Sequence, residues 1–380
     1  MLQPRNLRVA LVAGTLDRGG AEKQLFYMAR ALVRAGVDVR VCCLQRGEVF
    51  ETELQRVGIQ TAWIGRSAHP AWRTVAIVRA LADFQPDIVQ SAHFYTNLYV
   101  TAAALVYGAV GIGALRSNTR YEMTASGWWG RWLLRLPTVL LANSQAARRN
   151  AAWLGVRSET VYVVPNVIDL ATFDRAGADG VPLPREPGRV VVASVATHIP
   201  AKRLDRFIAA LARARTQAPG LLGLLIGGGP EHARLRALAL ELGLGPHDVH
   251  FVGPRDDVPR LLRAADLLLM TSDHEGFPNA ILEAMAARLP VITTPAGDAG
   301  VVVQDDVTGY VVPFDGVEQM AERLVRLVRS PELRRSLGRA GRVRVEQRYS
   351  ADELATSLLG AYRGIASLRA DEDLLKLIPT

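Results

Sequence analysis

Two glutamates lie eight positions apart in the stretch SDHEGFPNAILEAMA, which spans residues 272–286. Pro278 ends any helix that arrives from the N-terminal side, but it is tolerated in the first turn of a helix that begins there. Glu275 is therefore expected in a loop, and Glu283 about one and a half turns into the following helix. A loop carboxylate, a helix N-terminus and a helical carboxylate would then surround one place. This place suits a ligand with an anionic centre and hydroxyl groups on both sides.

A lysine stands out in the loop ATHIPAKRLDRF, which follows another strand-like run. Lysine occurs only three times in the chain, against 42 arginines, and one of the three is Lys202. A compact ammonium suits phosphate binding, although chance retention of a surface lysine is the alternative. In the loop DRGGAEK, Gly19 and Gly20 would let a backbone approach an anion at a helix N-terminus. A tight turn would also explain these glycines, and it is the better interpretation of the loop IGGGPEH.

Polar residues end two strand-like runs in the first half of the chain. His93 ends PDIVQSAH, and Arg116 and Asn118 end IGALRSN. We expect them at a ligand site, because ligands of open α/β sheets bind beyond the carboxyl ends of the strands. For His93, an ordinary polar cap at the strand end is the alternative. No zinc-ligand spacing and no G-x-S-x-G sequence occurs, and the acidic run at residues 371–373 is interpreted as solvated charge.

The elements that must position these residues alternate between apolar runs and helix-like segments. The runs LRVALVAG, VDVRVCCL, TVLLANS and VVVASVA are typical of parallel strands covered on both faces, so the fold class is α/β. The length of 380 residues, 49% of them hydrophobic, suffices for two or three domains. We predict an N-terminal domain over residues 1–173, a Gly- and Pro-rich linker over 174–189, a second domain over 190–349, and a C-terminal helical segment over 350–380.

Three features bear on the cellular compartment. The N-terminal apolar run soon meets charged residues, so it is interpreted as a first strand and not as a signal peptide. The uncharged stretch from Leu98 to Leu115 is long enough for a marginal membrane span, but three glycines interrupt it, which favours a buried helix, a turn and a buried strand. The only cysteines are the neighbours Cys42 and Cys43, which cannot staple a fold. A reducing, cytoplasmic location is therefore expected.

Basic charge is concentrated in the first half of the chain. The formal net charge is +8, of which residues 1–180 carry +7. This imbalance indicates an acidic partner such as anionic lipid, a charged substrate or nucleic acid, or else a solvated arginine-rich surface. No nucleic-acid-binding module supports the nucleic acid. The segment SGWWGRWLLRLP is typical of a helix on a membrane surface, whereas tryptophans packed into a core would give the same letters.

Together these segments resemble the retaining glycosyltransferases of family 4. The likeness covers nearly the whole chain and rests on GGAEKQLFYMARAL, LLANSQAARR, VVPNVIDLATF, IGGGP, HFVGPRDDVPRLLRAADLLLMTSDHEGFPNAILEAMA, LPVITTPAGDAG and VTGYVVP, together with Lys202. The spacing from Glu275 to Glu283 matches the signature pair of that family. The resemblance implies the GT-B architecture, with two facing Rossmann-like domains and an interdomain cleft. The first domain would bind the acceptor and receive the returning segment 350–380, and the second would bind the donor.

The resemblance also implies roles for individual residues. Glu275 would meet the hydroxyls of the donor sugar, Glu283 would bind the ribose, and Lys202 would stabilise the departing diphosphate. The expected donor-binding residues are Gly19, Gly20, Thr197, Lys202, Glu275, Gly276, Phe277, Pro278, Asn279 and Glu283. The expected catalytic residues are Glu275, Lys202 and His93, and the expected acceptor-binding residues are His93, Arg116 and Asn118.

The implied partners follow from this family. The donor would be a UDP- or GDP-linked sugar, with no metal and no other cofactor. The acceptor would be a saccharide, expected to be lipid-linked, in polysaccharide, lipopolysaccharide or glycolipid biosynthesis. The basic first half adds an expected peripheral contact with anionic lipid at the inner face of the cytoplasmic membrane.

Four places depart from the family pattern, and one of them is the stretch RSN, which replaces a histidine often found after the fifth strand. Thr197 stands where the family often has an arginine that shares the diphosphate, and His198 and Arg203 are the candidates to replace it. Arg288 replaces a glycine, and Val301 replaces a common glutamate. These departures leave two alternatives open: an epimerase of GT-B architecture that acts on the nucleotide sugar itself, and a weakly catalytic or non-enzymatic sugar-nucleotide-binding protein.

Overall fold

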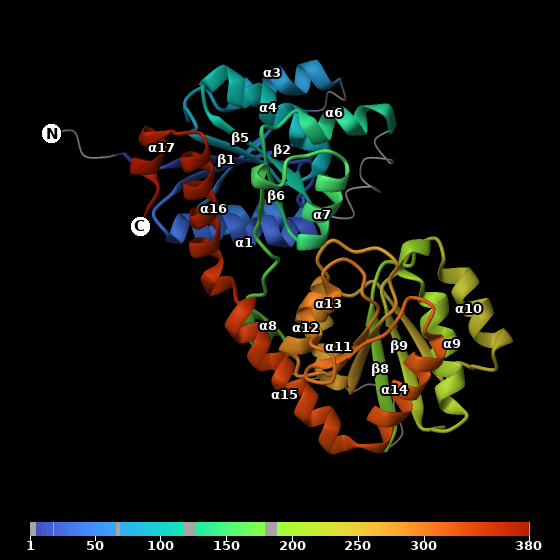
Figure 1. Cartoon of the computed structure of the whole chain (residues 1–380). Coiled ribbons are helices and arrows are strands. Elements are labelled where there is room, and N and C mark those ends of the chain that lie inside the picture. The colour runs from blue at the N-terminus through green and yellow to red at the C-terminus, as the bar shows by residue number, and fades with distance from the viewer. Residues whose placement is uncertain (1–4, 18, 66–68, 117–126, 179–187, 380) are drawn as a thin grey trace. The chain divides into compact units, whose positions relative to one another are not determined.

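The chain divides into two compact units, which are described separately here. The structure is a computed structural model that describes residues 5–17, 19–65, 69–116, 127–178 and 188–379. The first unit comprises Met1–Val167 and Ala351–Thr380, and the second comprises Ile168–Ser350. Within each unit, the described residues form one sheet flanked by helices (Figure 1).

The sheet of the first unit has the strand order β3-β2-β1-β4-β5-β6-β7, and its neighbouring strands pair in parallel. Its strands are β1 (Arg8–Ala13), β2 (Asp38–Cys43), β3 (Gln60–Trp63), β4 (Ile88–Ser91), β5 (Val110–Leu115), β6 (Val139–Ala142) and β7 (Val161–Val163). Its α-helices are α1 (Gly20–Arg34), α2 (Val49–Arg56), α3 (Pro70–Ala80), α4 (Asn97–Tyr107), α6 (Gly130–Arg135), α7 (Gln145–Trp153), α16 (Leu354–Leu368) and α17 (Glu372–Leu377). Short 3-10 helices are η1 (Phe94–Thr96), η2 (Gly127–Trp129), η3 (Ser158–Thr160) and η5 (Ala351–Glu353).

Successive side chains of β1 lie in two different buried clusters, which explains why helices cover both faces of this sheet. Val9 and Leu11 lie in one buried cluster with side chains of α1 and α16, whereas Ala10 and Val12 lie in another with side chains of α3 and α4. Successive side chains of a strand point to opposite faces, so a continuous apolar run requires a helix layer on each side. Figure 1 shows α1 and α16 on one side of this sheet and α3 and α4 on the other.

The second unit repeats this plan with the strand order β10-β9-β8-β11-β12-β13, again with parallel neighbours. Its strands are β8 (Val190–Val195), β9 (Leu221–Ile226), β10 (Val249–Gly253), β11 (Leu267–Met270), β12 (Val291–Thr293) and β13 (Gly309–Val311). Its helices are α8 (Leu170–Ala176), η4 (Pro200–Lys202), α9 (Leu204–Arg215), α10 (His232–Glu241), α11 (Val258–Ala264), α12 (Asn279–Ala286), α13 (Ala299–Val302), α14 (Val317–Arg329) and α15 (Pro331–Arg348).

The strand order fixes where a ligand site is expected in each unit. In the second unit the chain builds outward from β8 through β9 to β10, and then returns to the other side of β8 with β11. The loops that follow β8 and β11 therefore leave adjacent strands in different directions, which opens a crevice at their carboxyl ends. By the same reasoning, the crevice of the first unit lies between the loops after β1 and β4.

The division of the chain differs from the expected one. The first unit ends at Val167, not at residue 173, because α8 buries Phe173 in the core of the second unit. Asp174, expected in a linker, lies in α8 and forms an ion pair with Arg342 of α15. The Gly- and Pro-rich stretch therefore did not mark the place where the chain passes from the first unit to the second, which lies between Val167 and Ile168. The C-terminal helices α16 and α17 belong to the first unit, and Leu358 and Tyr362 of α16 are fully buried there.

The uncharged stretch from Leu98 to Leu115 forms the helix, turn and strand that its glycines indicate. It contains most of α4, a left-handed turn at Gly108 with φ 64°, and β5. Among the residues that the structure describes, no helix combines the length and the apolar character needed to span a bilayer.

Candidate active site

Lys202 and Glu275 meet at the crevice of the second unit. Lys202 ends η4 in the loop after β8, and Glu275 lies in the loop after β11. The Lys202 Nζ atom donates to Oε1 of Glu275 over 2.6 Å, and the two side chains are 23% and 13% exposed. The strand order therefore brings together two residues that are 73 positions apart.

The neighbouring loops hold the Glu275 carboxylate in place. The Ser272 hydroxyl donates to the same Oε1 atom over 2.8 Å, and the Thr294 hydroxyl donates to the Ser272 carbonyl over 2.6 Å. Gly297 has a left-handed φ of 58°, and a Cβ atom at this position would lie 2.6 Å from the Glu275 carbonyl oxygen. The loop after β12 thus packs closely against the backbone that carries Glu275.

The helix that follows begins as the sequence indicates. Pro278 is the N-terminal cap of α12, and Asn279 is its first residue. The N–H groups of a first helical turn lack partners within the helix and favour an anion. The Phe277 side chain packs in the core, where its ring lies edge-on against Tyr349 with 5.5 Å between the ring centroids. Glu283 lies half-buried on α12, just over one turn into the helix.

Thr197 stands where the family often has an arginine, and its side chain is exposed. His198 and Arg203, the two residues proposed to replace that arginine, both contact protein partners. The His198 ring is fully buried, stacks on His232 at 5.3 Å, and lies 3.3 Å from it between Nδ1 atoms. Burial, and then the proximity of His232, lower the pKa of His198, so this ring favours its neutral form. Gly229, with a left-handed φ of 152°, brings its backbone against the His198 carbonyl, so the IGGG loop serves packing.

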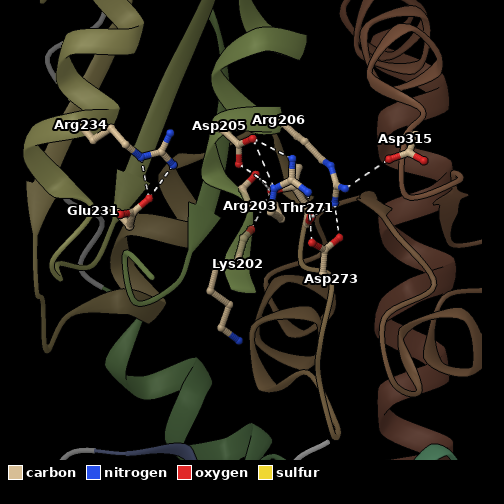
Figure 2. Close-up of polar contacts among 9 residues, drawn as sticks. All are labelled: Lys202, Arg203, Asp205, Arg206, Glu231, Arg234, Thr271, Asp273 and Asp315. Atoms are coloured by element: carbon tan, nitrogen blue, oxygen red, sulfur yellow. Dashed lines mark hydrogen bonds and ion pairs between the residues drawn. The ribbon is translucent and has the colours of Figure 1, made fainter. Parts of the chain in front are cut away.

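Arg203 also forms ion pairs within the protein through its side chain. It adopts the left-handed conformation with φ 48° and ψ 43°, and its guanidinium bonds Asp205 and Asp273 (Figure 2). These hydrogen bonds, with that to Asp205 the strongest influence, raise the pKa of Arg203. Both His198 and Arg203 are thus held by protein partners.

His93 lies at the crevice of the first unit, with both ring nitrogens engaged. Nδ1 accepts from the Gly14 N–H over 3.2 Å, which places the proton on Nε2. Nε2 then donates to Oε1 of Glu22 over 3.0 Å. Tyr95 stacks on the ring at 5.4 Å, and the His93 side chain is largely buried. Glu22, which lies within GGAEK on α1, is a site residue that sequence spacing did not identify.

The remaining candidates of the first unit lie in different surroundings. Gly19 caps α1 and Gly20 begins it, as the loop DRGGAEK indicates. Arg116 directs its guanidinium toward Met28 of α1, with 3.2 Å between Nη2 and Sδ. Asn118 lies outside the described residues, so its expected role stays a prediction.

Tryptophans are exposed on the first unit. Trp129 and Trp132 are 56% and 60% exposed, so the alternative that they pack into the core is wrong. The Trp128 side chain lies outside the description. Trp153, at the end of α7, is 70% exposed and lines a shallow pocket with Arg131 and Arg135 of α6. An apolar and cationic surface therefore covers this part of the unit.

Among the described residues, no three histidine, cysteine, aspartate or glutamate side chains gather as a metal site would require. The cationic side chain beside Glu275 is Lys202.

Two family models divide the chain between them. That of "Glycosyltransferase Family 4" matches residues 18–172, and that of "Glycosyl transferases group 1" matches residues 181–344. The chain belongs to glycosyltransferase family 4. The second model spans the loops that carry Lys202 and Glu275 and the helix that carries Glu283, and the first spans His93 and the Gly19–Gly20 loop.

Curated relatives of the chain differ in the molecules that their names say they act on. N-acetyl-alpha-D-glucosaminyl L-malate synthase of Bacillus anthracis is 31% identical over 172 residues, which are 45% of this chain and 44% of that enzyme. A GDP-mannose-dependent alpha-(1-6)-phosphatidylinositol monomannoside mannosyltransferase of Mycobacterium tuberculosis is 32% identical over 185 residues, 46% and 48% of the two chains. The chain thus spans about half the length of the curated relatives it matches.

The fold agrees with this membership. HepE of Anabaena, solved in complex with UDP-glucose, superposes with a TM-score of 0.78 over 96% of this chain and 100% of that one, at 20% identity. The chain therefore has the GT-B fold of two Rossmann-like units.

Proposed function

We propose that the chain transfers a sugar from a UDP- or GDP-linked donor to a saccharide acceptor, with retention of the anomeric configuration. The observation that carries this proposal is the Lys202–Glu275 pair at the switch point of the second sheet. Beside it, α12 offers a helix N-terminus and Glu283 a half-buried carboxylate. A cation, a helix N-terminus and two carboxylates match a diphosphate that is flanked by sugar hydroxyls.

The chemistry assigns each of these groups a task. As the bond between the anomeric carbon and the diphosphate breaks, negative charge grows on the phosphate oxygen, and Lys202 and the α12 N-terminus stabilise it. Glu275 accepts hydrogen bonds from the hydroxyls of the donor sugar, and Glu283 accepts from the ribose. The acceptor oxygen bonds to the anomeric carbon, and its proton ends on the departing nucleoside diphosphate. Attack on the face from which the diphosphate leaves retains the configuration.

Metal independence is part of the proposal. Lys202 and the α12 N-terminus provide positive charge where a divalent cation would otherwise be needed to neutralise the diphosphate. For the first unit by itself, the proposal assigns the Gly19–Gly20 loop at the N-terminus of α1 to an anionic group and His93 and Arg116 to the acceptor. Since both ring nitrogens of His93 are engaged, its task in this proposal is to orient and not to exchange protons.

The choice of donor follows the relatives. HepE binds UDP-glucose, and the mycobacterial mannosyltransferase depends on GDP-mannose, so UDP- and GDP-linked hexoses are the first donors to test. That mannosyltransferase acts on a phosphatidylinositol mannoside, which supports a lipid-linked acceptor for this chain.

Release of nucleoside diphosphate tests the function. Each nucleotide sugar is incubated with the protein and a mixture of saccharide acceptors, and the anomeric configuration of the product is read by NMR. We expect one donor to release its nucleoside diphosphate and to yield a product with the configuration of the donor. An inverted product would contradict retention, and an isomerised nucleotide sugar without release would identify an epimerase instead.

An anionic membrane is the partner we propose for the first unit. The exposed Trp129, Trp132 and Trp153 can place their rings at the level of the lipid headgroups, while Arg131 and Arg135 meet the headgroup phosphates. Each such cation contributes about 1 kcal/mol near an anionic surface, which gives reversible binding.

Co-sedimentation with liposomes tests this contact. Wild-type protein should bind vesicles that contain phosphatidylserine, should bind less at high salt, and should lose binding in the double variant Trp129→Ser/Trp132→Ser. Trp63→Ser is the matched control, because Trp63 is exposed on β3 at the edge strand of the sheet. Wild-type protein that stays in the supernatant at low salt would refute the membrane contact and favour a soluble acceptor.

A further inference from the structure

A second ionic network runs beside the Lys202–Glu275 pair and joins the same two loops. Arg203, directly after Lys202, donates from Nη1 to Oδ2 of Asp273 over 3.1 Å. Arg206 of α9 is buried and donates to the other carboxylate oxygen of Asp273. Asp273 lies two positions before Glu275. Each member of the Lys202–Glu275 pair therefore has a close neighbour in sequence within this network.

Backbone contacts tighten the same connection. The Thr271 hydroxyl donates to the carbonyl of Lys202 over 3.1 Å and to that of Arg203 over 2.8 Å. The Asp273 N–H donates to the Ala201 carbonyl over 2.9 Å. Figure 2 shows Arg203 between Asp205 and Asp273, and the Lys202 side chain directed away from them. The network thus fixes the backbone of Lys202, while the Lys202 ammonium bonds Glu275 instead of Asp205 or Asp273.

The backbone of Arg203 is unusual for its residue type. Its φ of 48° lies in the left-handed region, where a residue other than glycine is held at a cost by its surroundings. Here the surroundings are the bonds of its guanidinium to Asp205 and Asp273. Glycine would adopt this conformation without the cost, so at Arg203 the ionic bonds of the side chain offset it.

We infer that Arg203, Asp273 and Arg206 form a clamp that positions Lys202 and Glu275 for the transfer reaction. The clamp rests on the proposed function of that pair, and its three members are positioning residues that do not touch the substrate. A shift of about 1 Å between the loops would separate Nζ of Lys202 from the groups it stabilises, and displacements of this size cost about 10²-fold in rate.

Arg203→Gly and Asp273→Asn test the clamp, with Arg288→Gly as the matched control. Arg288 is also an arginine in the left-handed conformation of the second unit, with φ 62°, but it is exposed and lies outside the clamp. Glycine adopts a positive φ more readily than arginine does. The change in backbone preference alone should therefore not lower the unfolding temperature of either glycine variant. We expect kcat to fall about tenfold or more in the two clamp variants, with a smaller change in KM for the donor, and to stay unchanged in Arg288→Gly.

Amine labelling gives a readout that does not depend on activity. The chain has only three lysines, so the acetylation rates of Lys202 and Lys376 can be compared within one molecule by mass spectrometry. If the clamp holds the Lys202–Glu275 pair, labelling of Lys202 relative to Lys376 should rise about three- to tenfold in Arg203→Gly and Asp273→Asn, and not in Arg288→Gly.

The outcomes separate the clamp from the proposed function. Unchanged Lys202 labelling in both folded clamp variants would overturn the clamp, whatever the activity. A rise in labelling in the clamp variants, together with a wild-type protein that turns over no nucleotide sugar, would support the clamp and refute the proposed function. Increased labelling with wild-type kcat would show that the clamp does not serve transfer and would overturn the inference.

Discussion

Breaking the Lys202–Glu275 pair should abolish most activity at a modest cost in stability. The perturbation is a cycle of Lys202→Met, Glu275→Gln and the double variant, which keep the side-chain volumes nearly constant. At 2.6 Å and an effective dielectric constant of about 20, the gross attraction is about 6 kcal/mol. Desolvation offsets most of it, because both side chains are largely buried. We therefore expect each single variant to lose about 1–3 kcal/mol, or about 2–10 °C in unfolding temperature.

The effect on turnover should be much larger than the effect on stability. Removal of one preorganised group at a developing charge typically lowers kcat by about 10²–10³. Because the two residues act as a unit, the double variant should lose far less than the product of the two single losses. Steady-state release of nucleoside diphosphate measures these rates.

Lys376→Met is the control for this cycle. Lys376 pairs with Asp373 at 3.1 Å, but both side chains are mostly exposed, so neither stability nor turnover should change measurably. A folded Lys202→Met protein with the wild-type kcat would refute the assignment of this pair to the chemistry.

The remaining predictions concern stability and cofactors. Asp174→Ala should destabilise the second unit by about 1–3 kcal/mol in urea unfolding, because it removes two hydrogen bonds from the buried Arg342 guanidinium; an unchanged midpoint would contradict this. The pKa of His198 is below 6.5, so the unfolded chain takes up its proton first and stability should fall as the pH drops from about 6.5; His198→Phe should flatten this slope, and a flat wild-type profile would refute it. Activity should survive EDTA, and loss with recovery on adding magnesium or manganese would refute metal independence.

The sequence allowed the strands, the family and the loop positions of the main candidates to be predicted. Near-continuous apolar runs identified parallel strands, and Pro278 marked the start of α12 within one residue. Lys202 was identified by its rarity and by its place after a strand. These signals are local, so a single stretch of chain is enough to show them.

Contacts that depend on the three-dimensional arrangement could not be predicted from the sequence. Nothing in the spacing of 67 positions between Arg206 and Asp273 indicates that they pair, because their contact depends on the strand order. His198 was one of two candidates to replace the family arginine, but its ring is fully buried and stacks on His232. The unit boundary differs from the predicted one because the Gly- and Pro-rich stretch predicts a linker, whereas the short helix α8, which begins before it, already packs Phe173 into the second unit.

Binding of nucleotide sugars to the wild type and to Lys202→Met tests the central claim most directly. A panel of UDP- and GDP-linked sugars is screened by thermal unfolding. One donor should raise the unfolding temperature of the wild type saturably, since a ligand at about 100 times its Kd stabilises by about 2.7 kcal/mol. The same donor should shift Lys202→Met far less. A panel in which no nucleotide sugar shifts the wild type, or in which the shift persists in Lys202→Met, would contradict a donor site built around Lys202 and Glu275.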